Sequence, residues 1–439
     1  MELTGERQFL LRGGRIMDPA QDVDFVGDVL VHEDRIEHIA SEIDVPPSTK
    51  IVELSGKWIV PGLVDMHVHL REPGEEYKET IETGTRAAAA GGFTSVACMP
   101  NTCPSNDNSG ITRFIIDRAK DSGRCRVFPV AAITVGQDGK GLTEFGDLLS
   151  AGAVAFSDDG LPVQNPAVMR LALEYSLNFN ALIISHSEEL ELSKEGCMNE
   201  GKMSTRLGLK GIPVAAEEIA IFRDICLAKL TGARLHIAHV STAGSVEIIR
   251  NAKAQGVRVT AETAPHYFSL TEEAVAGYNT FAKMNPPLRT ERDRRAIIEG
   301  LRDGTIDAIA TDHAPHNSLE KECEFQLAAN GIIGLETALP LALKVLVNEE
   351  GFAPVQVMRL MSSNPASILD IPGGGLRPSG IADITIIDPE EEFTFTRDTI
   401  HSKSYNSPFL GLVFRGRAIS TLLGGMPVFD ANGLFDIGY

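Results

Sequence analysis

The sequence lacks an excess of basic residues. Among its 439 residues, sixty acidic side chains stand against forty lysines and arginines, and the formal net charge is −20. Nucleic acids and anionic membranes attract proteins through basic surfaces, so neither is expected as a partner. A small anionic substrate is still compatible with this charge, because a few local cations are enough to bind one.

Paired cysteines and long apolar runs are also missing. The six cysteines are scattered without a Cys-x-x-Cys pair, as is usual for reduced thiols of an intracellular protein. No stretch reaches the roughly eighteen apolar residues of a membrane span. The first residues, MELTGERQFLLRGG, show no basic segment followed by an apolar one. We therefore expect no secretory signal and a cytoplasmic location.

Both ends of the chain are rich in β-strand patterns. Segments such as GDVLVHEDRIEHIA near the N-terminus and ADITIIDP near the C-terminus alternate apolar and polar residues between Gly, Asp and Pro. This texture predicts one small β-sandwich domain built from residues 1–60 and 371–439. The middle of the chain, residues 61–370, has a different rhythm and is expected to form a separate domain.

Eight short apolar segments follow one another in this middle region, with helical patterns between them. They cover residues 62–70, 93–101, 125–134, 153–160, 181–188, 234–242, 258–266 and 306–316. Strands that alternate with helices indicate a parallel sheet, because a parallel connection needs a crossover. Eight units predict an α/β fold of the (β/α)8 TIM-barrel type, with its site where the strands end. A doubly wound open sheet is the alternative, but no G-x-G-x-x-G follows the first segment.

Potential metal ligands gather at the ends of these segments. Eight of the eleven histidines lie in them. In the stretch DMHVHL, His67 and His69 face the same way because side chains alternate along a strand, and a pair of imidazoles suits zinc. By itself this pair is equally compatible with two polar groups at a strand end. Other segment ends add further candidates: Asp158 or Asp159, His186, His239 and Asp312.

The order of several motifs resembles one known family. DMHVHLREPG, MPNT, FSDDG, SHSE, HIAHVST, KMNPPLR, TDHAPH and GLETALPL are similar to the dihydroorotases of bacterial type I, which belong to the amidohydrolase superfamily. The resemblance runs from about residue 8 to the SKSYNSPF segment near the C-terminus. It implies a zinc-dependent enzyme of pyrimidine (UMP) biosynthesis that reversibly cyclises N-carbamoyl-L-aspartate to L-dihydroorotate and water.

Residue by residue, the resemblance implies a two-zinc centre, although family members hold one or two ions. Neighbouring residues of a strand face opposite ways, so only one aspartate of SDDG can face the metals, and the family pattern selects Asp159 as the bridge. Asp312 would also transfer the catalytic proton. The implied ligands of one zinc ion are His67, His69 and Asp312, and those of the other are His186 and His239.

The resemblance also implies a substrate pocket. Arg71, Asn101 and His316 would bind the substrate carboxylate, since the planar fork of arginine suits bidentate recognition. Asn285 and the backbone at Asn330–Gly331 would contact the amide or urea edge of the ring. At the latter point the chain has AANGI where the family reads approximately A-P-F-G-I. Loss of the proline predicts a more mobile loop.

The remaining histidines and Asp158 receive structural roles. We expect His236 to pack on the opposite side of its strand from His239, and His313 and Asp158 to point away from the metals. His266 ends the seventh segment and has no assigned role. We expect the last three histidines, which lie in the β-rich ends, to be surface groups: His32, His38 and His401.

Two alternative functions remain open. A hydantoinase, dihydropyrimidinase or allantoinase is the enzymatic alternative, but such enzymes place a carboxylated lysine at the fourth strand end, and the nearest lysines here are Lys140 and Lys194. A non-catalytic, dihydroorotase-like scaffold for aspartate transcarbamoylase is the other, although a scaffold has no need to keep every ligand. We expect a homodimer, and family analogy allows association with aspartate transcarbamoylase.

Overall fold

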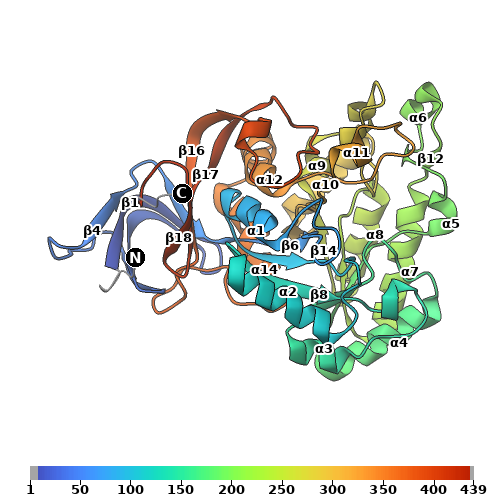
Figure 1. Ribbon diagram of the computed structural model, residues 1–439, viewed down its shortest axis with the longest axis horizontal. Coiled ribbons are helices and arrows are strands. Elements are labelled where there is room, and N and C mark those ends of the chain that lie inside the picture. The colour runs from blue at the N-terminus through green and yellow to red at the C-terminus, as the bar shows by residue number, and fades with distance from the viewer. Residues whose placement is uncertain (1–7, 436–439) are drawn as a thin grey trace.

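The computed structural model describes residues 8–435. Within this range the chain forms two eight-stranded sheets and one two-stranded sheet. One large sheet is a barrel surrounded by helices, and the other combines strands from both chain ends and lies beside it (Figure 1). Among the described residues, no helix has both the length and the apolar content needed to cross a membrane.

Each of the eight apolar segments forms one strand of the barrel, as predicted. All neighbouring strands are parallel. A parallel bridge joins Val68 to His313, and the backbone N–H of His69 donates to the His313 carbonyl at 2.8 Å. The first strand thus meets the segment after the last one, so the sheet is a nearly closed barrel and not an open sheet. In spatial order the strands are β6 (Leu63–Val68), β7 (Phe93–Cys98), β8 (Arg126–Ala131), β9 (Ala155–Ser157), β10 (Leu182–Ser185), β13 (Arg234–Ile237), β14 (Val259–Thr263) and β15 (Ala308–Ile309).

Alternation along the strands separates the inside of the barrel from its helical coat. On β10, Leu182 and Ile184 join a buried cluster shared with residues from β7, β8, β9 and β15, whereas Ile183 packs in the cluster that includes helix residues. Two residues further along the same face comes His186. The strand therefore aims this imidazole at the barrel mouth.

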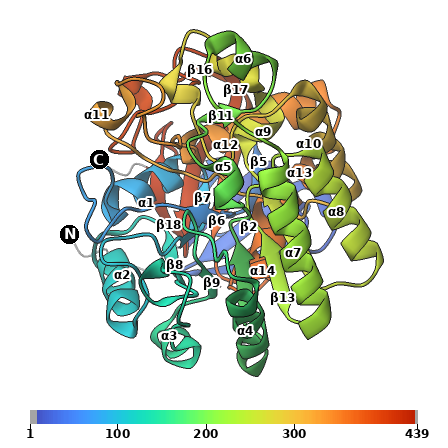
Figure 2. The ribbon, with the colours of Figure 1, turned by 90° about the vertical axis from the view of Figure 1, so that its right-hand side faces the viewer.

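Helices cover the outside of the barrel (Figure 2). Several begin at side-chain caps: Thr80 and Thr83 form a capping box, and the Asn108 side chain accepts from the first turn of α2. The helices are α1 (Ile81–Ala90), α2 (Ser109–Ser122), α3 (Phe145–Ala151), α4 (Pro166–Ser176), α5 (Leu190–Ser193), α6 (Lys202–Leu207), α7 (Ala215–Thr231), α8 (Ala243–Ala254), α9 (Pro265–Ser269), α10 (Glu291–Asp303), α11 (Ser318–Lys321), α12 (Leu335–Ala342), α13 (Pro354–Met358) and α14 (Asn364–Leu369). The two-stranded sheet pairs β11 (Met198–Asn199) with β12 (Gly211–Ile212).

The second large sheet confirms that both chain ends build one β unit. It is a single mixed sheet, in which β5 pairs parallel with β1 and antiparallel with β16. β1 is irregular between Leu11 and Gly14, and its two halves pair with β4 and β5 in turn. Gly13 in the irregularity has φ +69°, which glycine adopts at little cost. The strands are β1 (Gln8–Asp18), β2 (Val23–His32), β3 (Arg35–Ala40), β4 (Lys50–Glu53), β5 (Trp58–Pro61), β16 (Ile384–Thr394), β17 (Val413–Leu423) and β18 (Met426–Asp430). The division at residues 60 and 370 stays a prediction.

The SKSYNSPF segment returns from the chain-end sheet to the barrel mouth. Its Asn406 is buried, and the side-chain amide donates to the carbonyls of Ala314 at 3.0 Å and Gly331 at 3.1 Å. The Asn406 side-chain oxygen accepts the backbone N–H of His316 at 3.0 Å. One asparagine therefore ties together two loops that line the cavity described below.

Candidate metal centre and substrate cavity

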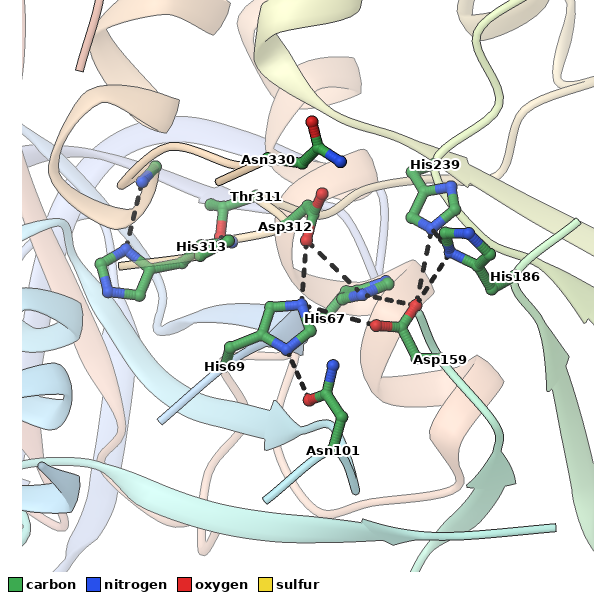
Figure 3. Close-up of polar contacts among 12 residues, drawn as sticks. His67, His69, Asn101, Asp159, His186, His239, Thr311, Asp312, His313 and Asn330 are labelled. Atoms are coloured by element: carbon green, nitrogen blue, oxygen red, sulfur yellow. Dashed lines mark hydrogen bonds and ion pairs between the residues drawn. The ribbon is translucent and has the colours of Figure 1, made fainter. Parts of the chain in front are cut away.

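The six side chains proposed as metal ligands come together at the carboxyl ends of five barrel strands (Figure 3). Asp159 lies in their middle: its Oδ1 is 3.3 Å from Nε2 of His67, 3.3 Å from Nδ1 of His186 and 3.5 Å from Nε2 of His239. Its Oδ2 is 3.5 Å from Nε2 of His69. One carboxylate thus touches all four imidazoles.

Asp312 lies beside the same pair of histidines from the first strand. Its Oδ1 is 3.1 Å from Nε2 of His69 and 3.7 Å from Nε2 of His67. Two sets of three residues bring potential ligand atoms within 4.8 Å of one another, namely His67 with Asp159 and His239, and His67 with His69 and Asp312. The geometry is compatible with a metal on either side of His67.

Two buried atoms at this centre show that the donor set fits a metal. Nε2 of His67 and Oδ1 of Asp159 are enclosed but have no hydrogen-bond partner. Buried polar atoms normally have partners, and a site for a metal ion is one physical reason for an exception. Imidazole nitrogens and carboxylate oxygens are ligands that zinc and similar divalent ions accept. These residues therefore form a candidate metal site.

The opposite ring nitrogens of three histidines have their own partners. Nδ1 of His67 lies 2.8 Å from Glu262 Oε1, Nδ1 of His69 lies 2.8 Å from Asn101 Oδ1, and Nε2 of His186 lies 3.2 Å from Glu188 Oε2. A hydrogen bond to one ring nitrogen leaves the lone pair on the other. In its neutral form, each of these imidazoles would therefore turn an acceptor nitrogen toward a metal in the centre, as metal ligation requires.

Asp158 and Asp159 point in opposite directions. Asp158 accepts the backbone N–H groups of Ile133 at 2.8 Å and Thr134 at 3.1 Å and also bonds the Thr134 hydroxyl. Burial raises the pKa of Asp158 to about 6 despite these hydrogen bonds. Asp158 thus secures the end of the neighbouring strand β8, and only Asp159 reaches the four imidazoles.

Imidazoles and carboxylates at the centre stabilise one another's charged forms. Burial opposes ionisation of Asp159, but His67, His186 and His239 hold its pKa well below its usual range. Burial likewise opposes the charge on Asp312, but the contact with His69 lowers the pKa of this carboxyl. His186 shows the reverse effect: burial favours its neutral form, yet Asp159 and Glu188 raise its pKa to about 10. Both aspartates are therefore carboxylates at neutral pH.

A cavity of about 210 Å³ opens above this centre. Five of the six ligand candidates line it, and His67 lies beneath, fully buried. All residues predicted to bind substrate also line the cavity: Arg71, Asn101, Asn285, His316, Asn330 and Gly331. Arg71 is the one arginine among the lining residues that the structure describes, and no lysine is among them.

Arg71 and His316 lie side by side on one wall of this cavity. Nε of Arg71 donates to the Pro315 carbonyl at 3.2 Å, and Nε2 of His316 lies 2.8 Å from the Asn330 carbonyl. Because a carbonyl oxygen only accepts, that imidazole nitrogen must carry its hydrogen. Burial and the Arg71 charge lower the pKa of His316 to about 2, so the ring is neutral. The wall thus carries one positive charge, held by Arg71.

Three residues at the barrel mouth adopt left-handed backbone conformations. Their φ angles are +62° for Arg71, +36° for His239 and +49° for Asp312. Such conformations cost energy in residues other than glycine and concentrate at functional sites. Here they turn each side chain inward just after its strand ends.

Sequence comparisons identify the family. Residues 56–245 match the family described as dihydro-orotase-like. The chain is 55% identical over 426 residues to the dihydroorotase of Syntrophobacter fumaroxidans, covering 96% of this chain and 97% of that protein. It is 56% identical over 421 residues to the dihydroorotase of Geobacter metallireducens, covering 96% and 99%. The chain belongs to the dihydroorotase family. It is therefore a cyclic-amide hydrolase.

Solved structures with the same fold include cyclic-amide hydrolases of a different name. L-Hydantoinase from Arthrobacter aurescens matches with a TM-score of 0.86, covers 96% of both chains and is 24% identical. Dihydropyrimidinase from Brevibacillus agri matches with a TM-score of 0.84 at 22% identity, covering 97% of this chain and 95% of that one. At such identities the likeness shows the fold alone, whereas the dihydroorotases are similar in sequence along nearly the whole chain.

Sequence reasoning missed three carboxylates around the centre of this family member. Glu262 and Glu188 orient His67 and His186 as described above, and both lie within or directly at the end of an apolar segment. Asp65 accepts the backbone N–H of His67 and that of Thr311, each at 3.1 Å, and so joins the first strand to the loop that carries Asp312. It shares a strand face with His67 and His69, which is the signal that identifies it.

Three other histidines have different environments. His236 is fully buried with Nδ1 2.8 Å from the Thr260 hydroxyl, and its Nε2 is 3.5 Å from Glu262. His313 points away from the cavity, accepts the Gly334 N–H at 3.1 Å and lies 3.3 Å from Glu79. His266 is buried and is not part of the cavity lining. Of the histidines expected at the surface, His38 is exposed, whereas His32 and His401 are half-buried.

Proposed function

We propose that this chain is a zinc-dependent dihydroorotase that reversibly cyclises N-carbamoyl-L-aspartate to L-dihydroorotate and water in pyrimidine biosynthesis. The observation that carries the proposal is the shared cavity. Its floor holds three histidines and two aspartates with His67 beneath them, and its wall holds Arg71, so a metal-activated reaction and the binding of an anionic substrate fit in one space.

Six side chains would hold two zinc ions. His67, His69 and Asp312 would bind one ion, His186 and His239 the other, with Asp159 between them. The central position of Asp159 supports its role as the bridge, since its two oxygens face all four imidazoles. When bound, zinc supplies a water whose pKa is lowered towards roughly 7 and polarises the amide carbonyl under attack.

Asp312 is proposed to move the proton. In ring opening it accepts a proton from the attacking water and delivers it to the departing ring nitrogen, and ring closure is the reverse. Both its contacts with imidazoles use Oδ1, which leaves Oδ2 for this transfer. The lowered pKa keeps the group ionised at neutral pH.

Three side chains are proposed to bind the substrate carboxylate. Arg71 supplies the charge, since this buried arginine lines the cavity. The Asn101 oxygen accepts from His69, so its NH₂ group is free to donate to substrate. His316 lies beside Arg71 and would complete this set by turning its single N–H from the Asn330 carbonyl to the carboxylate. Asn285 and the Asn330–Gly331 backbone would contact the amide or urea edge of the ring.

The alternatives receive less support. A hydantoinase-type centre uses a carboxylated lysine, and none of the described residues that line the cavity is a lysine. A scaffold without catalysis has no need for a complete ligand set, yet every proposed ligand is present. A homodimer, association with aspartate transcarbamoylase and a cytoplasmic location stay predictions.

One experiment separates these functions. Zinc is counted in the purified protein, and turnover is assayed with L-dihydroorotate, hydantoin, dihydrouracil and allantoin. We expect bound zinc and turnover of L-dihydroorotate. Turnover of hydantoin without L-dihydroorotate would refute the proposal, and full zinc loading without any turnover would favour the scaffold.

A second experiment tests the metal bridge with neighbouring residues. Asp159→Ala should lose activity and lower the zinc content, because it removes the carboxylate between the four imidazoles. Asp158→Ala is the matched control and should affect zinc content less, since this carboxylate bonds strand β8. Normal zinc content and rate in Asp159→Ala would contradict the bridge.

A further inference from the structure

A buried lysine lies behind the loop that carries Asn330 and Gly331. Lys321, the last residue of α11, is fully buried. Its ammonium group donates to the carbonyls of Ala329 at 2.8 Å, Gly331 at 3.0 Å and Lys283 at 3.2 Å. Three acceptors match the three hydrogens of an ammonium group. Burying such a charge is costly, so it is retained only with a full set of partners.

A second lysine bonds the preceding part of the same loop. Lys283 is 5% exposed, and its ammonium group donates to the carbonyls of Gln326 at 2.9 Å and Ala328 at 2.6 Å. The Lys283 backbone carbonyl also accepts the N–H of Gly331 at 2.9 Å. No ion pair joins either lysine to a carboxylate in the described part of the chain. Lys283 and Lys321 are called the lysine clamp below.

The lysine clamp and the cavity wall bond different carbonyls of this loop. The clamp donates to the carbonyls of residues 326, 328, 329 and 331, whereas the Asn330 carbonyl lies 2.8 Å from Nε2 of His316. Gly331 has φ +116°, and a Cβ there would lie 2.6 Å from that of Ala314. The loop therefore fits closely between the two lysines behind it and the cavity wall in front.

The hydrogen bonds from the lysine clamp affect the rigidity of the loop that lacks the family's proline. The sequence AANGI lacks the proline of the family pattern, which predicts a more mobile loop. Four hydrogen bonds from the lysine clamp restrain the same stretch of backbone. They provide a source of rigidity that does not depend on the residue at position 329.

We propose that Lys283 and Lys321 are positioning residues for substrate binding. They hold the Asn330–Gly331 backbone against His316 in the conformation that contacts the substrate. This inference rests on the proposed function, because that function assigns Asn330 and Gly331 to the substrate. Neither lysine lines the cavity, so their effect passes through the loop backbone.

The test replaces Lys321 by methionine, which has similar length and no hydrogen-bond donor. Steady-state kinetics with L-dihydroorotate gives KM and kcat, and hydrogen exchange read by mass spectrometry follows the backbone amides of residues 326–332. The control is Lys120→Met on α2, whose side chain is 71% exposed. We expect Lys321→Met to raise KM about tenfold or more with kcat changed less, and to speed exchange at Ala329 and Gly331 similarly. Lys120→Met should change neither.

The two readouts distinguish a failure of the proposed function from a failure of the lysine clamp. If the wild-type protein does not turn over L-dihydroorotate, the proposed function fails, and a positioning role in substrate binding fails with it. If the wild type is active but Lys321→Met has normal KM and normal exchange, the lysine clamp is refuted while the function stands. A loss of kcat at unchanged KM also overturns the inference. If Lys321→Met does not fold, the same measurements on Lys283→Met test the lysine clamp. This variant loses the two hydrogen bonds to the carbonyls of Gln326 and Ala328.

Discussion

Glu262 is the residue outside the ligand set whose replacement should most affect metal binding. It is buried on β14, and its Oε1 lies 2.8 Å from Nδ1 of His67. Burial opposes its charge, but His236 and His67 lower its pKa to about 2, so it is ionised at neutral pH. The carboxylate holds the His67 hydrogen on Nδ1 and leaves Nε2 for the metal. Its loss frees the ring to rotate or to carry its hydrogen on the wrong nitrogen.

The expected loss of zinc affinity depends on how much of the contact between Glu262 and His67 each substitution removes. Loss of a partner that orients a ligand histidine costs about 10- to 100-fold in metal affinity, or roughly 1.4–2.7 kcal/mol. Glu262→Gln keeps an oxygen that accepts from Nδ1 but loses the charge, so we expect the lower end of this range. Glu262→Ala removes the acceptor and should reach the upper end.

Zinc affinity is measured by competition with a chromophoric chelator after the metal has been removed. Asp28→Asn serves as the control, because Asp28 is a buried carboxylate in the chain-end sheet that accepts the N–H groups of Gly13 at 2.9 Å and Ile43 at 3.0 Å. It should bind zinc as the wild type does. Wild-type affinity in both Glu262 variants would refute the reasoning that His67 needs this partner.

Three further predictions concern the cavity wall, the lysine clamp and the metal. Arg71→Lys should raise KM for L-dihydroorotate about 10- to 100-fold with a smaller change in kcat, because an ammonium lacks the planar fork; unchanged KM would contradict the assignment. Burial and the Lys283 charge lower the pKa of Lys321 to about 7. The unfolded chain then binds more protons than the folded one above about pH 7, so stability rises with pH there. This group should add about 2 kcal/mol to the free energy of unfolding between about pH 7 and 9. In urea unfolding between about pH 7 and 9, the free energy of unfolding of Lys321→Met should rise less with pH than that of the wild type. An equal rise in both proteins would contradict the assigned role of Lys321. Chelation should lower the Tm, zinc should restore it, and a Tm indifferent to both would argue against a bound metal.

Local patterns in the sequence were enough to predict most of the barrel and the list of candidate metal ligands. Eight apolar segments between helical patterns predicted the strands, and each one forms. Alternation along a strand also showed that only one of Asp158 and Asp159 can face the metals, and the family resemblance selected Asp159. The same alternation put His67 and His69 on one face. These features are local, because a strand's two-residue period decides which side chains share a face whatever the rest of the chain does.

Contacts between distant segments depended on the tertiary structure. Glu262 meets His67 across 195 residues of sequence, and Asp65 reaches Thr311 across 246. Lys321 looks like any lysine in a polar stretch, yet folding buries it against three carbonyls. The physical reason is that a residue's own segment fixes its direction, whereas its partner depends on which strands and loops the closed barrel brings alongside. The sequence therefore determined which chemistry this protein carries, and the fold determined how those groups are held.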